Sequence, residues 1–145
     1  MTFPYAPPLV IQLPYRQDWK HLMSPLSGQK VLVVEDEAIT ALMIEGALLD
    51  AGASVIGPAA TVQQALALLE QHTPAVATLD LNLCGELSTK VANALDALHV
   101  PFLLASAYTS RSHIALPSAA GVVEKPYSPE SFIAAIVAVL AKRED

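Results

Sequence analysis

The chain has 145 residues, of which 53% are hydrophobic, and its formal net charge is −6 at pH 7. This length suits one domain with a substantial core, and the apolar content argues against wholesale disorder. The negative charge and the lack of a basic cluster argue against nucleic-acid binding through bulk electrostatics.

The sequence also indicates a cellular compartment. The single cysteine, Cys84, cannot form an intramolecular disulfide, which is typical of a reducing environment. No apolar run approaches the ~20 residues that a membrane-spanning helix needs. The N-terminus lacks the basic region of a signal peptide and is interrupted by prolines. We therefore expect a cytoplasmic protein with no membrane and no nucleic acid among its partners.

Residues 1–29 differ in composition from the rest of the chain. They hold five of the eleven prolines and four of the eight aromatic residues. We interpret them as a flexible, weakly docked N-terminal extension. Two alternatives stay open: an arm that lays its aromatic side chains on a partner or on the domain itself, or a mis-assigned leader upstream of a true start at Met23.

From Lys30 onward, short apolar runs alternate with longer amphipathic ones. Strands are predicted at 30–35, 53–57, 75–80, 101–106 and 120–125, and helices at 37–52, 65–72, 88–99 and 128–143. The strands are runs of small or branched apolar residues, typical of a parallel sheet buried on both faces. The pattern predicts a doubly wound α/β domain over residues 30–141, with 142–145 as a tail.

Polar side chains follow four of the five predicted strands. Glu35, Asp36 and Glu37 follow the first strand, and Asp80 ends the third with Asn82 two residues on. Ser106 ends the fourth strand, and Lys125 with Pro126 follows the fifth. Ligands of such folds bind beyond the C-terminal ends of the strands, so we expect these groups to meet at one edge.

All of these residue types fit the same chemistry, which is phosphoryl transfer assisted by a metal ion. Clustered carboxylates recruit Mg²⁺, which prefers oxygen ligands and substrate phosphate. A carboxylate such as Asp80 can attack phosphorus to form an aspartyl phosphate. A metal ion and the ammonium of Lys125 can neutralise the charge of phosphoryl transfer. Singly, each residue is more often a helix cap or a turn residue; the ordered set favours a functional site.

This set resembles the receiver domain of two-component response regulators. The resemblance covers about residues 30–141 and rests on "VLVVEDE", on Asp80, Ser106 and "KP", and on the 44 residues from Asp36 to Asp80. It implies a flavodoxin-like sheet with strand order 2-1-3-4-5. "VPFLLASAY" and "LDLNLCGELSTKVANAL" are similar to a subgroup of single-domain alphaproteobacterial receivers with a Phe-Ala-Thr-Gly-Tyr-like stretch after strand four.

The resemblance implies a Mg²⁺ site. Asp36 and Asp80 would ligate the ion through their carboxylates, with Glu35 beside them as the second acid. The backbone carbonyl of Asn82 would complete the protein ligands.

The resemblance also implies a role for each phosphoryl-binding group. Asp80 would accept the phosphoryl group, Ser106 would hydrogen-bond it and Lys125 would pair with it. The bond from Lys125 to Pro126 would be cis. The protein would be a stand-alone response regulator and no enzyme beyond self-phosphorylation and autodephosphorylation. It would take its phosphoryl group from a histidine kinase or a histidine phosphotransfer protein and signal to a downstream protein that the sequence does not identify.

Two departures from the family pattern concern the way in which the protein would pass its signal to a partner. Receivers usually carry Phe or Tyr three residues before the lysine as a rotamer switch, whereas this chain has Val122, and Tyr108 is a candidate to replace it in part. Weak helical periodicity and Pro117 between Ser106 and Lys125 predict that the fourth helix is short or absent.

Two alternative functions remain open at this stage. The first is a phosphorylation-independent pseudo-receiver that acts only as an interaction module. The second is a Mg²⁺-dependent phosphohydrolase that uses Asp80 as its nucleophile. The second fits less well, because Asn82 stands where such enzymes usually carry an acid and because the nucleophile strand comes third.

Overall fold

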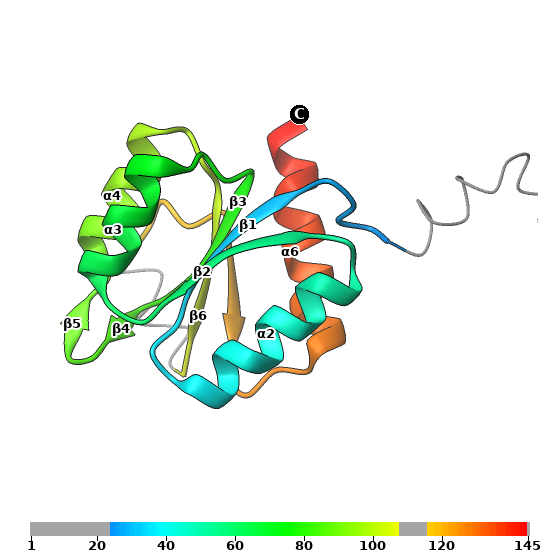
Figure 1. The fold of residues 1–145 in the computed structure, drawn as a ribbon, viewed down its shortest axis with the longest axis horizontal. Helices are drawn as coiled ribbons and strands as arrows, with labels where there is room; N and C mark the ends of the chain where they lie inside the picture. The colour runs from blue at the N-terminus through cyan, green and yellow to red at the C-terminus, as the bar shows by residue number, and fades with distance from the viewer. Residues whose placement is uncertain (1–23, 108–115, 145) are drawn as a thin grey trace, which may run out of the picture.

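The computed structural model describes residues 24–107 and 116–144, which form a five-stranded parallel sheet between two layers of helices (Figure 1). The strands are β1 (Lys30–Val34), β2 (Ser54–Ala59), β3 (Val76–Asp80), β6 (Phe102–Ser106) and β7 (Gly121–Glu124). They are ordered β2-β1-β3-β6-β7, and every neighbouring pair is parallel. The predicted flavodoxin-like fold with strand order 2-1-3-4-5 is confirmed.

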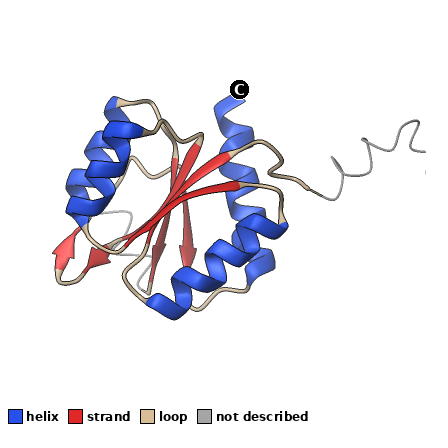
Figure 2. Cartoon of the chain, viewed as in Figure 1, coloured by secondary structure: helices blue, strands red, loops and turns tan. Residues whose placement is uncertain are grey.

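The helices lie in pairs on the two faces of the sheet (Figure 2). One face is covered by α3 (Val62–Gln71) and α4 (Thr89–Ala97), and the other by α2 (Ala38–Asp50) and α6 (Pro129–Glu144). The sheet therefore separates two hydrophobic clusters.

Strand β1 shows why the sequence has no alternation of polar and apolar residues. Val31 and Val33 belong to the cluster beneath α2 and α6, and Leu32 and Val34 to the cluster beneath α3 and α4. All four are at most 1% exposed. A strand with a core on each side needs an apolar residue at every position.

The segment after Asp80 contains two short strands that the sequence did not predict. It forms a hairpin of β4 (Asn82–Leu83) and β5 (Glu86–Leu87), which pair antiparallel. The turn residues Cys84 and Gly85 have φ of 52° and 86°. Two consecutive left-handed residues are what a two-residue hairpin turn requires. Such turns usually carry Asn-Gly. Because this chain has cysteine in place of asparagine, the sequence did not indicate the turn.

The folded region extends beyond the residues expected to form it. Residues 24–29, expected in the N-terminal extension, pack against the domain: Leu26 is fully buried, and its N–H donates to the Ala51 carbonyl at 2.9 Å. At the other end, α6 continues to Glu144. The predictions about residues 1–23, and about a short fourth helix and Tyr108 within 108–115, lie outside the described residues. None of the described helices has the length and apolar character needed to cross a bilayer.

Replacing Leu26 by alanine tests whether the domain core begins before β1. We expect Leu26→Ala to lower the free energy of unfolding by about 2–5 kcal/mol, the usual cost of truncating a buried leucine. Denaturant unfolding measures it. The control is Leu98→Ala, at a position 42% exposed, which we expect to change stability by less than about 1 kcal/mol. Equal effects of the two substitutions would contradict the packing of Leu26.

Candidate functional site

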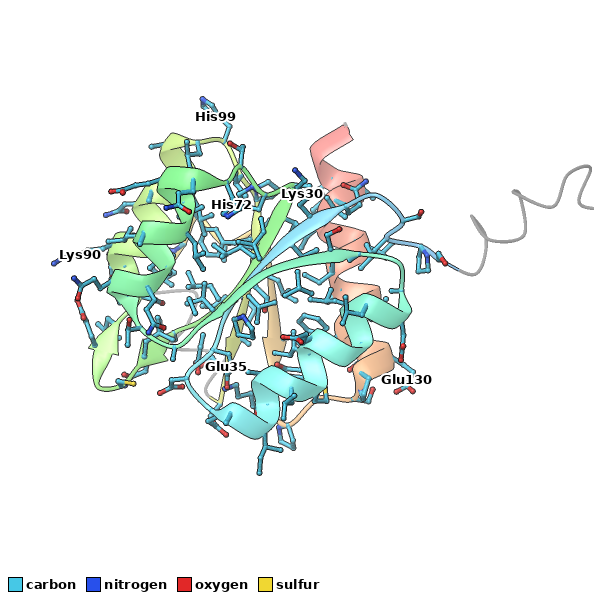
Figure 3. All side chains as sticks on the ribbon, in the orientation of Figure 1. Lys30, Glu35, His72, Lys90, His99 and Glu130 are labelled. Carbon is cyan, nitrogen blue, oxygen red and sulfur yellow. The ribbon has the colours of Figure 1, made fainter. Side chains whose placement is uncertain are left out.

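Three carboxylates meet at the C-terminal edge of the sheet. Asp80 is the last residue of β3, and Glu35 and Asp36 directly follow β1, its hydrogen-bonded neighbour. One carboxylate oxygen of each lies within 4.8 Å of the others. Glu35 is 3% exposed and Asp80 8% exposed. Figure 3 shows Glu35 near the start of α2, at the opposite end of β1 from Lys30.

Lys125 places its ammonium among these carboxylates. Its Nζ donates to both oxygens of Glu35, at 3.0 and 3.2 Å, and to Asp80 Oδ2 at 3.1 Å. The lysine directly follows β7, and its backbone N–H donates to the Ser106 carbonyl at 2.9 Å. The Lys125–Pro126 bond is cis, as the family resemblance implied. One cation thus joins the ends of β1, β3 and β7.

Burial and neighbouring charged groups shift the pKa values of Glu35 and Lys125. Burial, with the Asp80 carboxylate alongside, raises the pKa of Glu35 from 4.5 to about 7, although Lys125 opposes the shift. Burial by itself lowers the pKa of Lys125, but its hydrogen bonds to Glu35 and Asp80 and their charges outweigh that effect and raise it. The site therefore favours a cation.

Two further residues contact the charged groups at this edge. The sequence placed Glu37 here without giving it a role, and it did not place Cys84 in the site. Glu37 Oε1 lies 3.5 Å from Lys125 Nζ. The backbone N–H of Cys84 donates to Asp36 Oδ2 at 3.0 Å, so the hairpin turn lies over the acidic cluster. The run Glu35–Glu37 could have indicated the first contact. The second depends on the hairpin, which the sequence did not reveal.

Ser88 holds the base of the hairpin. It is fully buried, and both its hydroxyl, at 3.0 Å, and its N–H, at 2.9 Å, donate to the carbonyl of Leu81. Leu81 lies between Asp80 and Asn82, so these two bonds fix the backbone at the point where the strand leaves the sheet. The hairpin is thus held at its base by Ser88 and at its turn by Asp36.

The comparisons with known proteins agree with this geometry. The family model of the response regulator receiver domain matches residues 31–137. The chain belongs to the response regulator receiver domain family. No curated protein sequence matches it.

Solved structures with the same fold include several response regulators. PhyR from Brucella abortus is 26% identical with a TM-score of 0.76, over 89% of this chain and 54% of that chain. CheY4 of Vibrio cholerae is 25% identical with a TM-score of 0.68, over 77% and 98%. The receiver domain of Erythrobacter litoralis PhyR is 24% identical with a TM-score of 0.72, over 81% and 93%. This receiver domain thus spans about half the length of the Brucella PhyR chain.

The remaining predicted residues of this receiver domain also lie near the edge. Ser106, 5% exposed, ends β6, next to β3 in the sheet. Asn82 is the exposed first residue of β4. Val122 lies in β7 opposite Leu104 and packs against the core on the α3–α4 side. Val122 is half-buried, and its side chain packs against this cluster.

The histidines of the described residues lie away from this edge. Figure 3 shows His72 and His99 toward the end of the sheet that carries Lys30, opposite to Glu35. Neither is placed to serve the acidic cluster.

The donor set fits a magnesium ion. Hard carboxylate oxygens are the ligands that Mg²⁺ prefers, and two or three of them leave room for water and phosphate oxygens. The carboxylates of Glu35, Asp36 and Asp80 are near enough to one another to share one ion. Burial and the neighbouring Asp80 both raise the pKa of Glu35, and a bound cation would favour its charged form.

The raised pKa of Glu35 predicts how stability depends on pH without metal. A carboxyl group whose pKa is higher in the folded than in the unfolded state stabilises the fold while it is protonated. We therefore expect this contribution to the free energy of unfolding to decrease as pH rises from 4.5 to about 7. Urea unfolding in EDTA at a series of pH values measures it.

The variant Glu35→Gln isolates this group, because glutamine does not titrate. We expect the difference in stability between wild type and Glu35→Gln to change through this pH window, with the wild type losing more as pH rises. A difference that stays constant, or a wild type that gains relative stability, would contradict the assignment.

Proposed function

We propose that Asp80 accepts a phosphoryl group from a phosphohistidine on a histidine kinase or a histidine phosphotransfer protein. The observation that carries the proposal is the contact of Lys125 Nζ with Asp80 Oδ2, at 3.1 Å, beside the carboxylates of Glu35 and Asp36. A nucleophilic carboxylate, a cation beside it and a second acidic pair are the groups that such a transfer needs.

In the proposed reaction, an oxygen of Asp80 attacks phosphorus in line with the leaving imidazole. A phosphorus–oxygen bond forms, the phosphorus–nitrogen bond breaks, and its electron pair returns to the donor's imidazole ring. Lys125 neutralises negative charge on the phosphoryl oxygens. Ser106, at the end of the neighbouring strand, hydrogen-bonds one of these oxygens. Hydrolysis of the aspartyl phosphate then resets the site.

The proposal includes a magnesium ion. Asp36, Asp80 and the backbone carbonyl of Asn82 would hold it, with Glu35 as the second acid beside them. The ion supplies neutralisation of phosphoryl charge. The hydrogen bond from Cys84 to Asp36 and the Ser88 clamp on Leu81 would keep Asp36 and the Asn82 carbonyl in position.

The output of the protein would be a contact with another protein. The proposal places it in the cytoplasm, as its single cysteine suggests. The second candidate function is a phosphorylation-independent interaction module. It is favoured by Val122, which packs against the core at the position where receivers usually carry an aromatic switch.

A phosphorylation experiment separates the two functions. With Mg²⁺ and a small phosphodonor, or with a phosphorylated histidine kinase, we expect a base-labile label that reaches one phosphoryl group per chain. We expect Asp80→Asn to abolish it, because the amide cannot act as the nucleophile. The matched control, Asp96→Asn on the exposed face of α4, should retain it.

Each other outcome has a distinct meaning. No label under either condition would support the pseudo-receiver, and rapid multiple turnover of phosphomonoesters would support a phosphohydrolase. A full label on Asp80→Asn would show that another residue accepts the phosphoryl group.

Metal binding can be tested without phosphorylation. Mg²⁺ at 100 times its dissociation constant should raise the free energy of unfolding by about 2.7 kcal/mol. We expect Asp36→Asn to weaken Mg²⁺ binding at least about tenfold, because loss of even a group that orients a metal ligand typically costs about 10–100-fold in metal affinity. The control Asp50→Asn, at the exposed end of α2, should bind Mg²⁺ as the wild type does. Equal stabilisation of Asp36→Asn and wild type would contradict the proposed ligand set.

A further inference from the structure

Helix α2 is apolar on two opposite sides. Ala41, Ile44 and Leu48 are buried against the sheet. Ile39, Leu42 and Leu49 are 85%, 70% and 54% exposed. With the exposed Gly46, the latter recur at intervals of three and four residues, the spacing of a helix-packing seam. An exposed apolar stripe of this length marks a binding surface.

A groove runs between α2 and α6, which pack side by side (Figure 1). The α2 residues Ala47 and Asp50 line it, and they directly follow Gly46 and Leu49 of the stripe in the sequence. The groove has a volume of about 630 Å³ and is lined on its apolar part by Ala47, Ile133, Ala134 and Val137. Pro25, the second described residue of the chain, forms part of its wall. The described part of the chain therefore begins beside this groove.

The charged residues that line the groove are acidic. They are Asp50 and Glu130, and α2 also carries Glu45 but no lysine or arginine. A second copy packed α2 against α2 would place acidic residues beside acidic residues at a cost in free energy. The surface fits an occupant that is apolar and carries basic residues.

We propose that residues 15–23 of this same chain occupy the surface formed by the apolar stripe and the groove. Their apolar residues Tyr15, Trp19 and Leu22 follow the spacing of one helix face. The basic residues Arg16 and Lys20 outnumber the one acidic residue, Asp18, so the segment is basic on balance. They lead directly into Pro25 at the groove.

The occupant is long enough to cover the surface. The thirteen residues of α2 span about 20 Å at 1.5 Å per residue. Nine residues reach about 30 Å when extended, and about 14 Å as a helix. The inference does not depend on phosphorylation. Its consequence is that the N-terminal segment competes with any other protein for α2, which begins beside the acidic cluster.

The single tryptophan, Trp19, reports on this contact directly. In the full chain we expect its fluorescence to be blue-shifted and protected from acrylamide relative to N-acetyltryptophanamide. Leu49→Arg, which places a cation in the stripe, should shift the emission to that of the free indole. The matched control is Leu87→Arg on the hairpin, at a position 53% exposed against 54% for Leu49, and it should leave the emission unchanged.

A second variant leaves the domain surface untouched. Lys20→Glu should also expose Trp19, because it replaces an attractive charge by a repulsive one, and added salt should weaken docking in the wild type. Three results would overturn the proposal: free-indole emission in the wild type, protection that persists in Leu49→Arg, or protection that grows with protein concentration. The last would assign the surface to a second copy.

Discussion

The ion cluster around Lys125 is the interaction on which the site depends. Without a cation, the carboxylates of Glu35 and Asp80 would repel each other at the buried ends of adjacent strands. The ammonium of Lys125 lies 3.0 to 3.2 Å from their oxygens. These ion pairs connect the ends of β1, β3 and β7. A cation that is already part of the folded site is also ready to neutralise a phosphoryl group without reorganisation.

A second constraint acts on the segment that leaves the site. The hairpin β4–β5 is bonded at its turn to Asp36, through the N–H of Cys84, and at its base to Leu81, through Ser88. Any ligand that reorients Asp36 would therefore act on the hairpin and on its exposed Leu87. The hairpin connects the acidic cluster to the protein surface by hydrogen bonds that the structure shows directly.

The two helix layers differ in the apolar surface that they expose to solvent. On the α3–α4 side the helices have one apolar face each, whereas α2 is apolar toward the sheet and toward solvent. The apolar residues of α2 are enough to predict a helix. Because they lie on two opposite sides, they do not indicate which side packs on the sheet. Only the positions of β1 and α6 show that Ile44 is inside and Leu42 outside.

Much of the fold and the site could be read from the sequence, because periodicity and strand ends are local. Apolar runs without alternation predicted a parallel sheet buried on both faces, and the residues after each run predicted Glu35, Asp36, Asp80, Ser106 and Lys125 at one edge. The hairpin was not predictable, because its turn depends on a left-handed Cys84 stabilised by Asp36, 48 residues away. The burial of Leu26 was missed because the residue lies in a short, aperiodic segment.

The sequence by itself therefore determined the family, the order of the helices and of the five strands of the sheet, and the identity of the charged groups at the ends of those strands. The tertiary structure decided how those charges pair. It placed Lys125 between Glu35 and Asp80, brought Glu37 to 3.5 Å from the same ammonium, and closed the hairpin over Asp36. The physical reason is that the spacing of residues along the chain reflects the period of each helix or strand, which is a local property. Distances between side chains of different elements are set only when the two hydrophobic clusters pack on the sheet.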